Sequence, residues 1–352
     1  MMKKIILVTG SSGLIGSEVV SFFCALGYQV YGIDNNMRQA FFGVNGSTSS
    51  TLSRLQNNFS KFINFDVDIR DKEKIEGIIK KIKPFALIHT AAQPSHDKAS
   101  EIPHLDFEVN ALGTLNLLEA VRKFTKDTIF VHMSTNKVYG DTPNKLNIVE
   151  LENRWEFKGK YFKKGIDENM SIDNSTHSLF GVSKASSDLL VQEYGRYFKI
   201  PTCCLRGGCL TGPSHSGVEL HGFLNYLIRC NLTRKKYKIF GYKGKQVRDN
   251  IHSYDVVNFM YEFIKKPRIA SVYNLGGGYS NSISLKESIE KIESLTNIRM
   301  IYDYSDQERT GDHICYYSNL NKLKSDYPKW TITKNIDYIF EDVYKTLANR
   351  KI

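Results

Sequence analysis

The segment that most constrains the fold lies at the start of the chain, where an apolar run meets a glycine-rich turn. Residues 5–9 are apolar, residues 10–16 read Gly-Ser-Ser-Gly-Leu-Ile-Gly, and residues 14–26 have the periodicity of a helix. A buried strand that enters a helix through such a turn leaves backbone amides free to face an anion. This order predicts an α/β fold with an anion site at its first turn.

The same alternation of short apolar runs and helical patterns continues along the chain. Further strands are predicted at 29–33, 62–66, 86–89 and 128–133, and further helices at 72–81, 112–124 and 181–198. Such alternation builds a doubly wound parallel sheet whose two faces are covered by helices. The final third, from about residue 205, mixes shorter elements and predicts a smaller C-terminal α/β domain. We expect one domain from 1–204 with 247–272, and a second from 205–246 with 273–352.

The stretch 141–174 differs from the rest because it is polar and lacks a clean period. It is also longer than most connections between elements. Loops of that size often act as lids or binding loops.

An aspartate follows the second predicted strand. Asp34 stands 24 residues after Gly10, where a carboxylate accepts hydrogen bonds from the ribose of a bound dinucleotide. The same carboxylate would repel a 2′-phosphate, which favours NAD over NADP despite the nearby Arg38. The plainer alternative is a glycine-rich turn followed by a solvated aspartate.

The chain is basic, with 48 Lys and Arg against 37 Asp and Glu, a formal net charge of +11. The basic residues are spread along the sequence, and the densest cluster is only Arg234-Lys235-Lys236. No nucleic-acid-reading motif accompanies them, so we expect no nucleic-acid partner. A basic surface still attracts anionic small molecules.

Cysteine usage and hydropathy place further limits on the chain. The six cysteines form no Cys-x-x-Cys pair and no metal-ligand spacing, so we expect reduced thiols, a cytoplasmic location and no metal. No run of 18 apolar residues is present, so we expect no membrane partner. The apolar residues 5–8 faintly resemble a signal peptide, but a buried first strand explains them better.

Several motifs follow the glycine turn in a fixed order. They are Asp68-Ile69, His89-Thr90-Ala91-Ala92, the run 110–120, the run Ser134-Thr135-Asn136-Lys137-Val138-Tyr139-Gly140, and Arg248-Asp249 followed by His252 and Asp255. Together with the G-x-x-G-x-x-G spacing of the turn, they resemble the extended short-chain dehydrogenases/reductases, the group of nucleotide-sugar epimerases and dehydratases. The resemblance covers nearly the whole chain, and the order of the motifs is more specific than any one of them.

The resemblance implies a Rossmann-type NAD-binding domain, a nucleotide-sugar-binding domain and NAD as the cofactor. It also implies a homodimer or larger homo-oligomer formed through the helices 112–124 and 181–198. By resemblance, the residues that bind the cofactor are Gly10, Gly13, Leu14, Ile15, Gly16, Asp34, Asn35, Asp68, Ile69, Thr90, Ala91, Ala92, Asn110 and Lys184.

The family's catalytic Tyr-x-x-x-Lys motif is altered in this chain. Residues 177–184 read His-Ser-Leu-Phe-Gly-Val-Ser-Lys, so Lys184 matches the family's lysine and Phe180 stands at the tyrosine position. The family's tyrosine exchanges a proton with the sugar hydroxyl, and phenylalanine cannot. Three explanations remain open: another residue is the base, the reaction differs, or the protein is inactive.

Three residues are candidates for the proton transfer that the missing tyrosine would perform. Thr135 matches the family's active-site Ser/Thr, His177 precedes Phe180 by three residues, and Cys209 lies in a loop that faces the substrate in the family. The plainer alternatives are that Thr135 caps a strand, that His177 is a loop histidine and that Cys209 is a small buried apolar group. Lys184 is expected to bind the nicotinamide ribose and to make the local field positive.

The pair after Thr135 bears on the reaction. Asn136-Lys137 replaces the Asp-Glu pair of sugar 4,6-dehydratases, which disfavours dehydration. The runs 134–141 and 244–249 resemble the CDP-paratose 2-epimerase branch, and so does Gln93. This branch implies inversion at C2 of a CDP-linked deoxysugar through a 2-keto intermediate. The alternatives are a 4-epimerase, a reductase, or a non-catalytic NAD-binding sensor.

Two arginines are expected to hold the nucleotide diphosphate, because a planar fork suits phosphate oxygens. Arg248 and Arg309 match the family's anchors, and surface ion pairs are the plainer alternative. The expected substrate-binding residues are Gln93, Thr135, Asn136, Cys209, Arg248 and Arg309.

Overall fold

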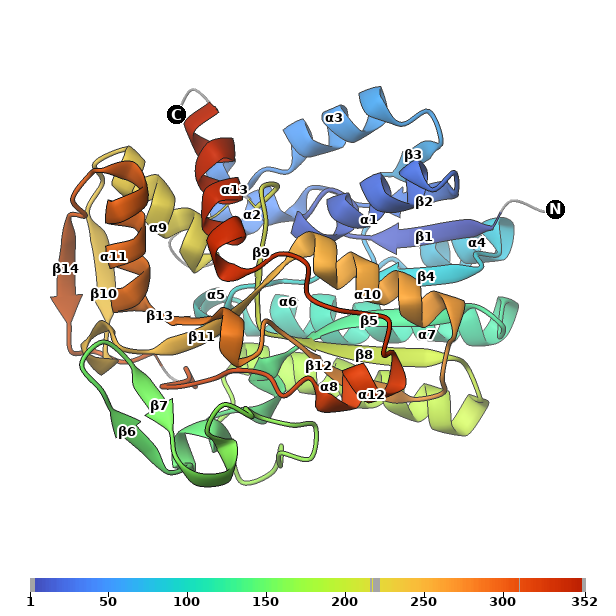
Figure 1. The fold of residues 1–352 in the computed structure, drawn as a ribbon. Coiled ribbons are helices and arrows are strands. Elements are labelled where there is room, and N and C mark those ends of the chain that lie inside the picture. The colour runs from blue at the N-terminus through green and yellow to red at the C-terminus, as the bar shows by residue number, and fades with distance from the viewer. Residues whose placement is uncertain (1–3, 216, 218–221, 310, 350–352) are drawn as a thin grey trace.

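A seven-stranded parallel sheet forms the centre of the computed structural model, which describes residues 4–215, 217, 222–309 and 311–349 (Figure 1). Its strand order is β12-β8-β5-β4-β1-β2-β3. The strands are β1 Ile5–Thr9, β2 Gln29–Ile33, β3 Phe62–Phe65, β4 Ala86–His89, β5 Ile129–Thr135, β8 Thr202–Gly207 and β12 Ser271–Leu275. The order reverses beside β1, as in a doubly wound sheet.

Helices cover both faces of this sheet. Successive residues of β1 point to opposite faces, so Ile6 and Val8 lie in one apolar core and Leu7 in another. The first core contains side chains of α1 Leu14–Ala25, α3 Ser49–Asn58, α10 Ser253–Lys265 and α12 Asn321–Asp326. The second contains side chains of α2 Met37–Phe42, α4 Lys72–Ile82, α7 Gly113–Phe124 and α8 Leu179–Phe198. The predicted doubly wound α/β fold is confirmed.

The predicted elements match the structure to within a few residues. The strands 5–9, 29–33 and 86–89 have the predicted bounds, and the predicted helix 72–81 extends to Ile82. The helix predicted at 112–124 is the end of a longer helical run. It follows α5 His96–Glu101, α6 Pro103–Phe107 and a π-helical turn, Glu108–Leu112.

A second group of elements lies at one end of the sheet (Figure 1). Their third apolar core joins α9 Phe223–Leu232, β10 Tyr237–Phe240, β13 Ser282–Ser284, α11 Leu285–Thr296 and α13 Ile336–Asn349. β10 pairs with β14 Tyr302–Ser305, and β11 Val247–His252 lies between β13 and β9 Cys209–Thr211. The expected domain boundaries at 204/205 and 272/273 fall inside β8 and β12, and the division into two domains stays a prediction.

The polar stretch 141–174 is folded onto the body of the protein. Its two short strands, β6 Ile148–Glu150 and β7 Trp155–Phe157, form an antiparallel hairpin. Phe157 and Ile166 are buried in a fourth apolar core with Tyr139, Tyr316 and Tyr317. Strands of three residues are too short to show a period in the sequence. No helix within the described ranges is long and apolar enough to cross a membrane.

A buried ion pair joins α8 to the sheet. Arg206 on β8 donates from Nε and Nη2 to the two carboxylate oxygens of Asp188 at 3.1 and 2.9 Å. Ser134 at the end of β5 donates to the same carboxylate at 2.6 Å. Arg206 Nη1 also donates to the Tyr139 hydroxyl at 3.1 Å, which in turn donates to Asn274 on β12 at 2.7 Å. This network ties one helix to three strands.

We predict that Asp188→Asn lowers the free energy of unfolding by about 3 kcal/mol, because it leaves the Arg206 cation buried without a counter-charge. Urea unfolding followed by circular dichroism measures the change. The control is Glu193→Gln, which breaks the exposed Glu193–Arg196 pair on the same helix and should cost less than about 0.5 kcal/mol. Equal losses in the two variants would contradict this account.

Candidate functional site

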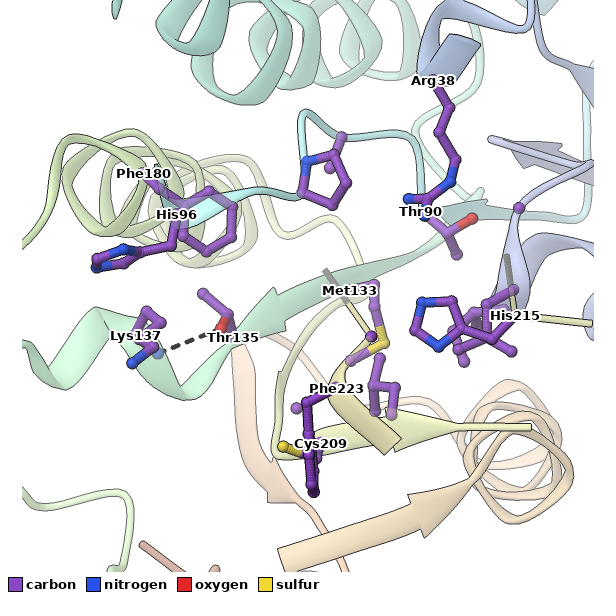
Figure 2. Close-up of a pocket in the computed structure, with 18 of the residues that line it drawn as sticks. Arg38, Thr90, His96, Met133, Thr135, Lys137, Phe180, Cys209, His215 and Phe223 are labelled. Atoms are coloured by element: carbon purple, nitrogen blue, oxygen red, sulfur yellow. Dashed lines mark hydrogen bonds between the residues drawn. The ribbon is translucent and has the colours of Figure 1, made fainter. Parts of the chain in front are cut away.

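A cavity of about 480 Å³ lies where the carboxyl ends of the sheet strands meet the second group of elements. Gly10 follows β1, Asp34 follows β2, Thr90 follows β4 and Gly208 follows β8, and all four line it. Parallel sheets bind ligands at this edge. Figure 2 shows Arg38, Thr90 and His215 toward one end, and Thr135, Lys137, Phe180 and His96 toward the other.

The glycine turn is closely packed. Gly10 has a φ of +67°, and a Cβ there would lie 2.8 Å from the backbone nitrogen of Ala91. A Cβ on Gly16 would lie 2.0 Å from the carbonyl oxygen of Gly10. Gly10, Gly13, Leu14 and Ile15 line the cavity, whereas Gly16 packs beneath the turn. The turn therefore presents bare backbone at both lining glycines, as a pyrophosphate requires.

Asp34 is held at the same end of the cavity by backbone amides. Ser12 N donates to its Oδ2 at 2.8 Å, and Asn36 N donates to its Oδ1 at 2.9 Å. Burial raises its pKa. Each oxygen keeps a lone pair that a ribose hydroxyl can reach, so the turn and this carboxylate together fit a dinucleotide. The other cofactor residues predicted from the sequence that line the cavity are Asn35, Asp68, Ile69, Thr90, Ala91, Ala92 and Lys184.

Gln93 and Asn110 lie behind the cavity wall. Asn110 Oδ1 accepts from the backbone nitrogen of Gln93 at 3.0 Å, and the Gln93 amide donates to Asp106 at 2.7 Å. The Asn110 amide donates to Asp106 at 3.0 Å and to Ser183 at 3.1 Å. These contacts fix the loop after β4 against α8. The structure therefore places both side chains where they support the site without lining it.

Lys184 and Phe180 occupy one face of α8 at the i and i+4 spacing. Lys184 is buried, and its Nζ donates to the carbonyl of Met133 at 2.8 Å. Burial lowers the pKa of Lys184 to about 8. Phe180 and Thr135 also line the cavity, and the Thr135 hydroxyl accepts from the backbone nitrogen of Lys137 at 3.2 Å. The position of the family's catalytic tyrosine is therefore occupied by a side chain of similar shape, a phenyl ring that carries no hydroxyl.

The two candidate substitutes for the tyrosine lie in different places. Cys209 lines the cavity, but burial raises its pKa to about 12, so its thiol stays protonated at neutral pH. His177 is not among the lining residues. It precedes the first turn of α8, and its Nε2 lies 2.8 Å from the carbonyl oxygen of Ile172. Both positions are unfavourable for a base.

Two cations share one half-buried carboxylate at the far end of the cavity. Lys137 Nζ and Arg248 Nη2 lie 2.7 and 2.8 Å from the same oxygen of Asp312. Burial opposes ionisation of this group, but Arg248 and Lys137 hold the pKa of Asp312 well below its usual range. Arg309 lies over the ring of Phe240 and 3.6 Å from Asp97. The excess of positive charge suits an anionic ligand.

Sequence reasoning missed several lining residues. Lys137 lies in the run 134–140, but nothing local in the sequence indicates that it meets Asp312. His96 and Asp97 belong to no motif that the sequence analysis used. Other missed residues are apolar or aromatic and come from the second group of elements, including Phe223, Tyr237, Phe240, Ile283 and Leu285. Among the described side chains, no group of three or more His, Cys, Asp or Glu is placed to hold a metal ion.

Comparisons with known proteins agree with this geometry. Residues 6–276 match the NAD dependent epimerase/dehydratase family. The CDP-paratose 2-epimerase of Salmonella typhi is 33% identical over 329 residues, which cover 90% of this chain and 92% of that protein. A dTDP-glucose 4,6-dehydratase of Escherichia coli is 28% identical over 343 residues, or 91% of this chain and 87% of that protein.

Solved structures share the fold. A UDP-glucuronic acid 4-epimerase of Bacillus cereus superposes with a TM-score of 0.80 at 23% identity, covering 98% of this chain and 99% of that one. That structure is of a tyrosine-to-phenylalanine mutant in complex with UDP-4-deoxy-4-fluoro-glucuronic acid and NAD. With the family match spanning most of the sequence, the chain belongs to the NAD dependent epimerase/dehydratase family.

Proposed function

We propose that this protein is an NAD-dependent nucleotide-sugar epimerase that inverts C2 of a CDP-linked deoxysugar. The observation that carries the proposal is one cavity with a dinucleotide cradle at one end and cationic side chains at the other. Lys184 and Thr135 line the same cavity. The similarity to a CDP-paratose 2-epimerase supports C2 as the centre and CDP as the nucleotide.

The chain's own residues have distinct tasks in this reaction. Bound NAD supplies reversible hydride acceptance at the sugar carbon. The glycine turn holds the cofactor pyrophosphate, and Asp34 holds its ribose. Arg248 and Arg309 bind the substrate diphosphate, so the sugar is free to turn between the loss and the return of hydride. The Thr135 hydroxyl hydrogen-bonds the reacting oxygen, and the Lys184 cation stabilises negative charge on it.

The pair after Thr135 argues against dehydration. A dehydratase needs an acid beside the leaving hydroxyl, and Asn136 and Lys137 offer no carboxyl group. The cavity carboxylates of Asp97 and Asp312 both face cations. The second candidate function, a non-catalytic NAD sensor, rests on Phe180 alone. A sensor has no need of Arg248 and Arg309 in the same cavity.

A homodimer in the cytoplasm fits this function. Val182 and Leu189 on α8 are each 44% exposed, and Leu112 before α7 is 43% exposed. Apolar side chains on neighbouring helices favour a subunit contact there. The six cysteines are free, as a reducing compartment requires.

The first prediction from the proposed function concerns turnover. Incubation with CDP-sugars, UDP-sugars and NAD⁺ in ordinary and deuterated water, followed by proton NMR, should show inversion at C2 of a CDP-sugar. The carbon-bound hydrogen should be retained, and no net NADH should form, because the hydride returns to the carbon that lost it. Inversion at C4 would move the substrate assignment, and stoichiometric NADH consumption would indicate a reductase. NAD binding without conversion of any sugar would favour the sensor.

The second prediction concerns Lys184, whose pKa falls from 10.5 to about 8 on folding. The unfolded chain binds this proton more tightly, so the contribution of Lys184 to stability rises as the pH increases from about 8 to 10.5. At pH 7 the buried cation destabilises the cofactor-free protein. Lys184→Met should therefore raise the unfolding free energy there by about 2 kcal/mol and flatten its pH dependence, while conversion falls.

Chemical unfolding of the cofactor-free protein at pH 7 and pH 10 measures this effect. Lys158→Met is the control because Lys158 is exposed, and its unfolding free energy should change by less than about 0.5 kcal/mol. A loss of stability in Lys184→Met at pH 7 would refute the proposed cost of burying this charge.

A further inference from the structure

The proposed reaction needs a group that accepts the proton of the sugar hydroxyl, and Phe180 cannot. We propose that His96 performs this task through its Nε2 atom. This inference rests on the proposed function and names its base. His96 lines the cavity at the start of α5, a helix that packs against α8. Figure 2 shows its imidazole toward the end of the cavity where Phe180 and Thr135 also lie.

The hydrogen bonds of the His96 ring leave one of its two nitrogens without a partner among the described residues. Its Nε2 is buried and has no hydrogen-bond partner among the described residues. An unsatisfied buried nitrogen costs about 1–3 kcal/mol, and native proteins seldom keep one without a reason. A Cβ on Gly311 would lie 3.4 Å from this nitrogen, in van der Waals contact with it, so glycine at this position keeps a further side chain from packing against Nε2. A ligand hydroxyl in the cavity is the partner that this nitrogen lacks.

Asp97 prepares the ring for proton transfer. Its Oδ1 lies 3.6 Å from His96 Nδ1, on the opposite side of the ring from Nε2. Although burial opposes it, His96 and Arg309 hold the pKa of Asp97 below its usual value, so its carboxylate stays ionised. A carboxylate beside Nδ1 favours the tautomer with its proton there and a lone pair on Nε2. It also stabilises the imidazolium that forms when Nε2 takes a proton.

Three other titratable groups of the cavity are less suited to this task. Lys137 donates to Asp312 at 2.7 Å and to the Gly311 carbonyl at 3.2 Å, so it is held as a cation. Lys184 donates to Met133 and is protonated below about pH 8. The Cys209 thiol is protonated, because burial raises its pKa to about 12. Of these four residues, His96 is the one with a buried side-chain nitrogen that has no hydrogen-bond partner among the described residues.

The proton balance closes within one catalytic cycle. As the sugar carbon gives its hydride to the cofactor, the hydroxyl O–H bond breaks, a C=O bond forms, and an N–H bond forms at His96 Nε2. After the sugar turns, the hydride returns to the opposite face and Nε2 returns its proton to the oxygen. NAD and His96 are both regenerated at the end of the cycle, so no other oxidant or base is needed.

The test compares His96→Gln with His104→Gln, which removes an exposed histidine from the adjoining helix α6. We expect His96→Gln to lower kcat at least about 100-fold, the usual contribution of a general base. The dissociation constant of the CDP-sugar, measured by calorimetry, should change by less than about threefold, because the diphosphate anchors are intact. Added imidazole should restore part of the turnover of a His96→Gly variant. His104→Gln should behave as wild type.

A second readout does not depend on turnover. In ¹⁵N-histidine-labelled wild-type protein, the sugar nucleotide should shift one Nε2 resonance, which is assigned by its absence from His96→Gln. A 2-deoxy sugar nucleotide, which lacks the hydroxyl, should not shift it. The shift is measured on wild-type protein, and the variant is used only to assign the resonance.

The outcomes separate the two proposals. If wild type converts no sugar but the nucleotide sugar shifts the His96 resonance, the proposed function fails and the contact stands. If wild type converts the sugar and His96→Gln keeps its kcat, His96 is not the base. The inference would also be overturned if the sugar nucleotide does not shift the His96 resonance. It would be overturned as well if His96→Gln binds the CDP-sugar more weakly but keeps its kcat. Loss of conversion in His177→Gln but not in His96→Gln would assign the base to His177.

Discussion

The ion pair between Asp188 and Arg206 fixes where α8 lies against the sheet, and the site depends on that position. Two charges buried this deeply hold their geometry, because separating them leaves each without water or a partner. Phe180, Lys184 and Asp188 follow one another at four-residue intervals along one face of the helix. The pair that anchors the third of these residues therefore sets where the first two enter the cavity.

The exchange of tyrosine for Phe180 changes the chemistry of the cavity more than its shape. A phenyl ring fills nearly the same volume, so the helix packs as before and Lys184 keeps its bond to the end of β5. What disappears is one titratable oxygen. Under the proposed function, a proton acceptor has to come from another element, and α5 contributes a cavity-lining histidine whose Nε2 has no hydrogen-bond partner among the described residues.

Much of the fold and the cofactor cradle could be predicted from the sequence because their signals are local. The turn at Gly10 and the strands around it depend on neighbouring residues, and they have the predicted bounds. The rest of the site depends on long-range contacts. Asp312 meets Lys137 across 175 residues of chain, and the unpartnered nitrogen of His96 is visible only in three dimensions. His177 shows where prediction from local spacing fails. Its position three residues before Phe180 suggested that it lines the cavity, but α8 begins at Leu179 and His177 is not among the lining residues.

The carboxylate between Lys137 and Arg248 gives the cavity an internal counter-ion. Under the proposed function, a phosphate that reaches Arg248 meets a cation whose charge Asp312 already balances in part, so the phosphate competes with this carboxylate. Competition of this kind lowers affinity, because the attraction gained is offset by the attraction given up. Under the proposed function, a substrate diphosphate would therefore be held less tightly than by the same two cations without Asp312 between them.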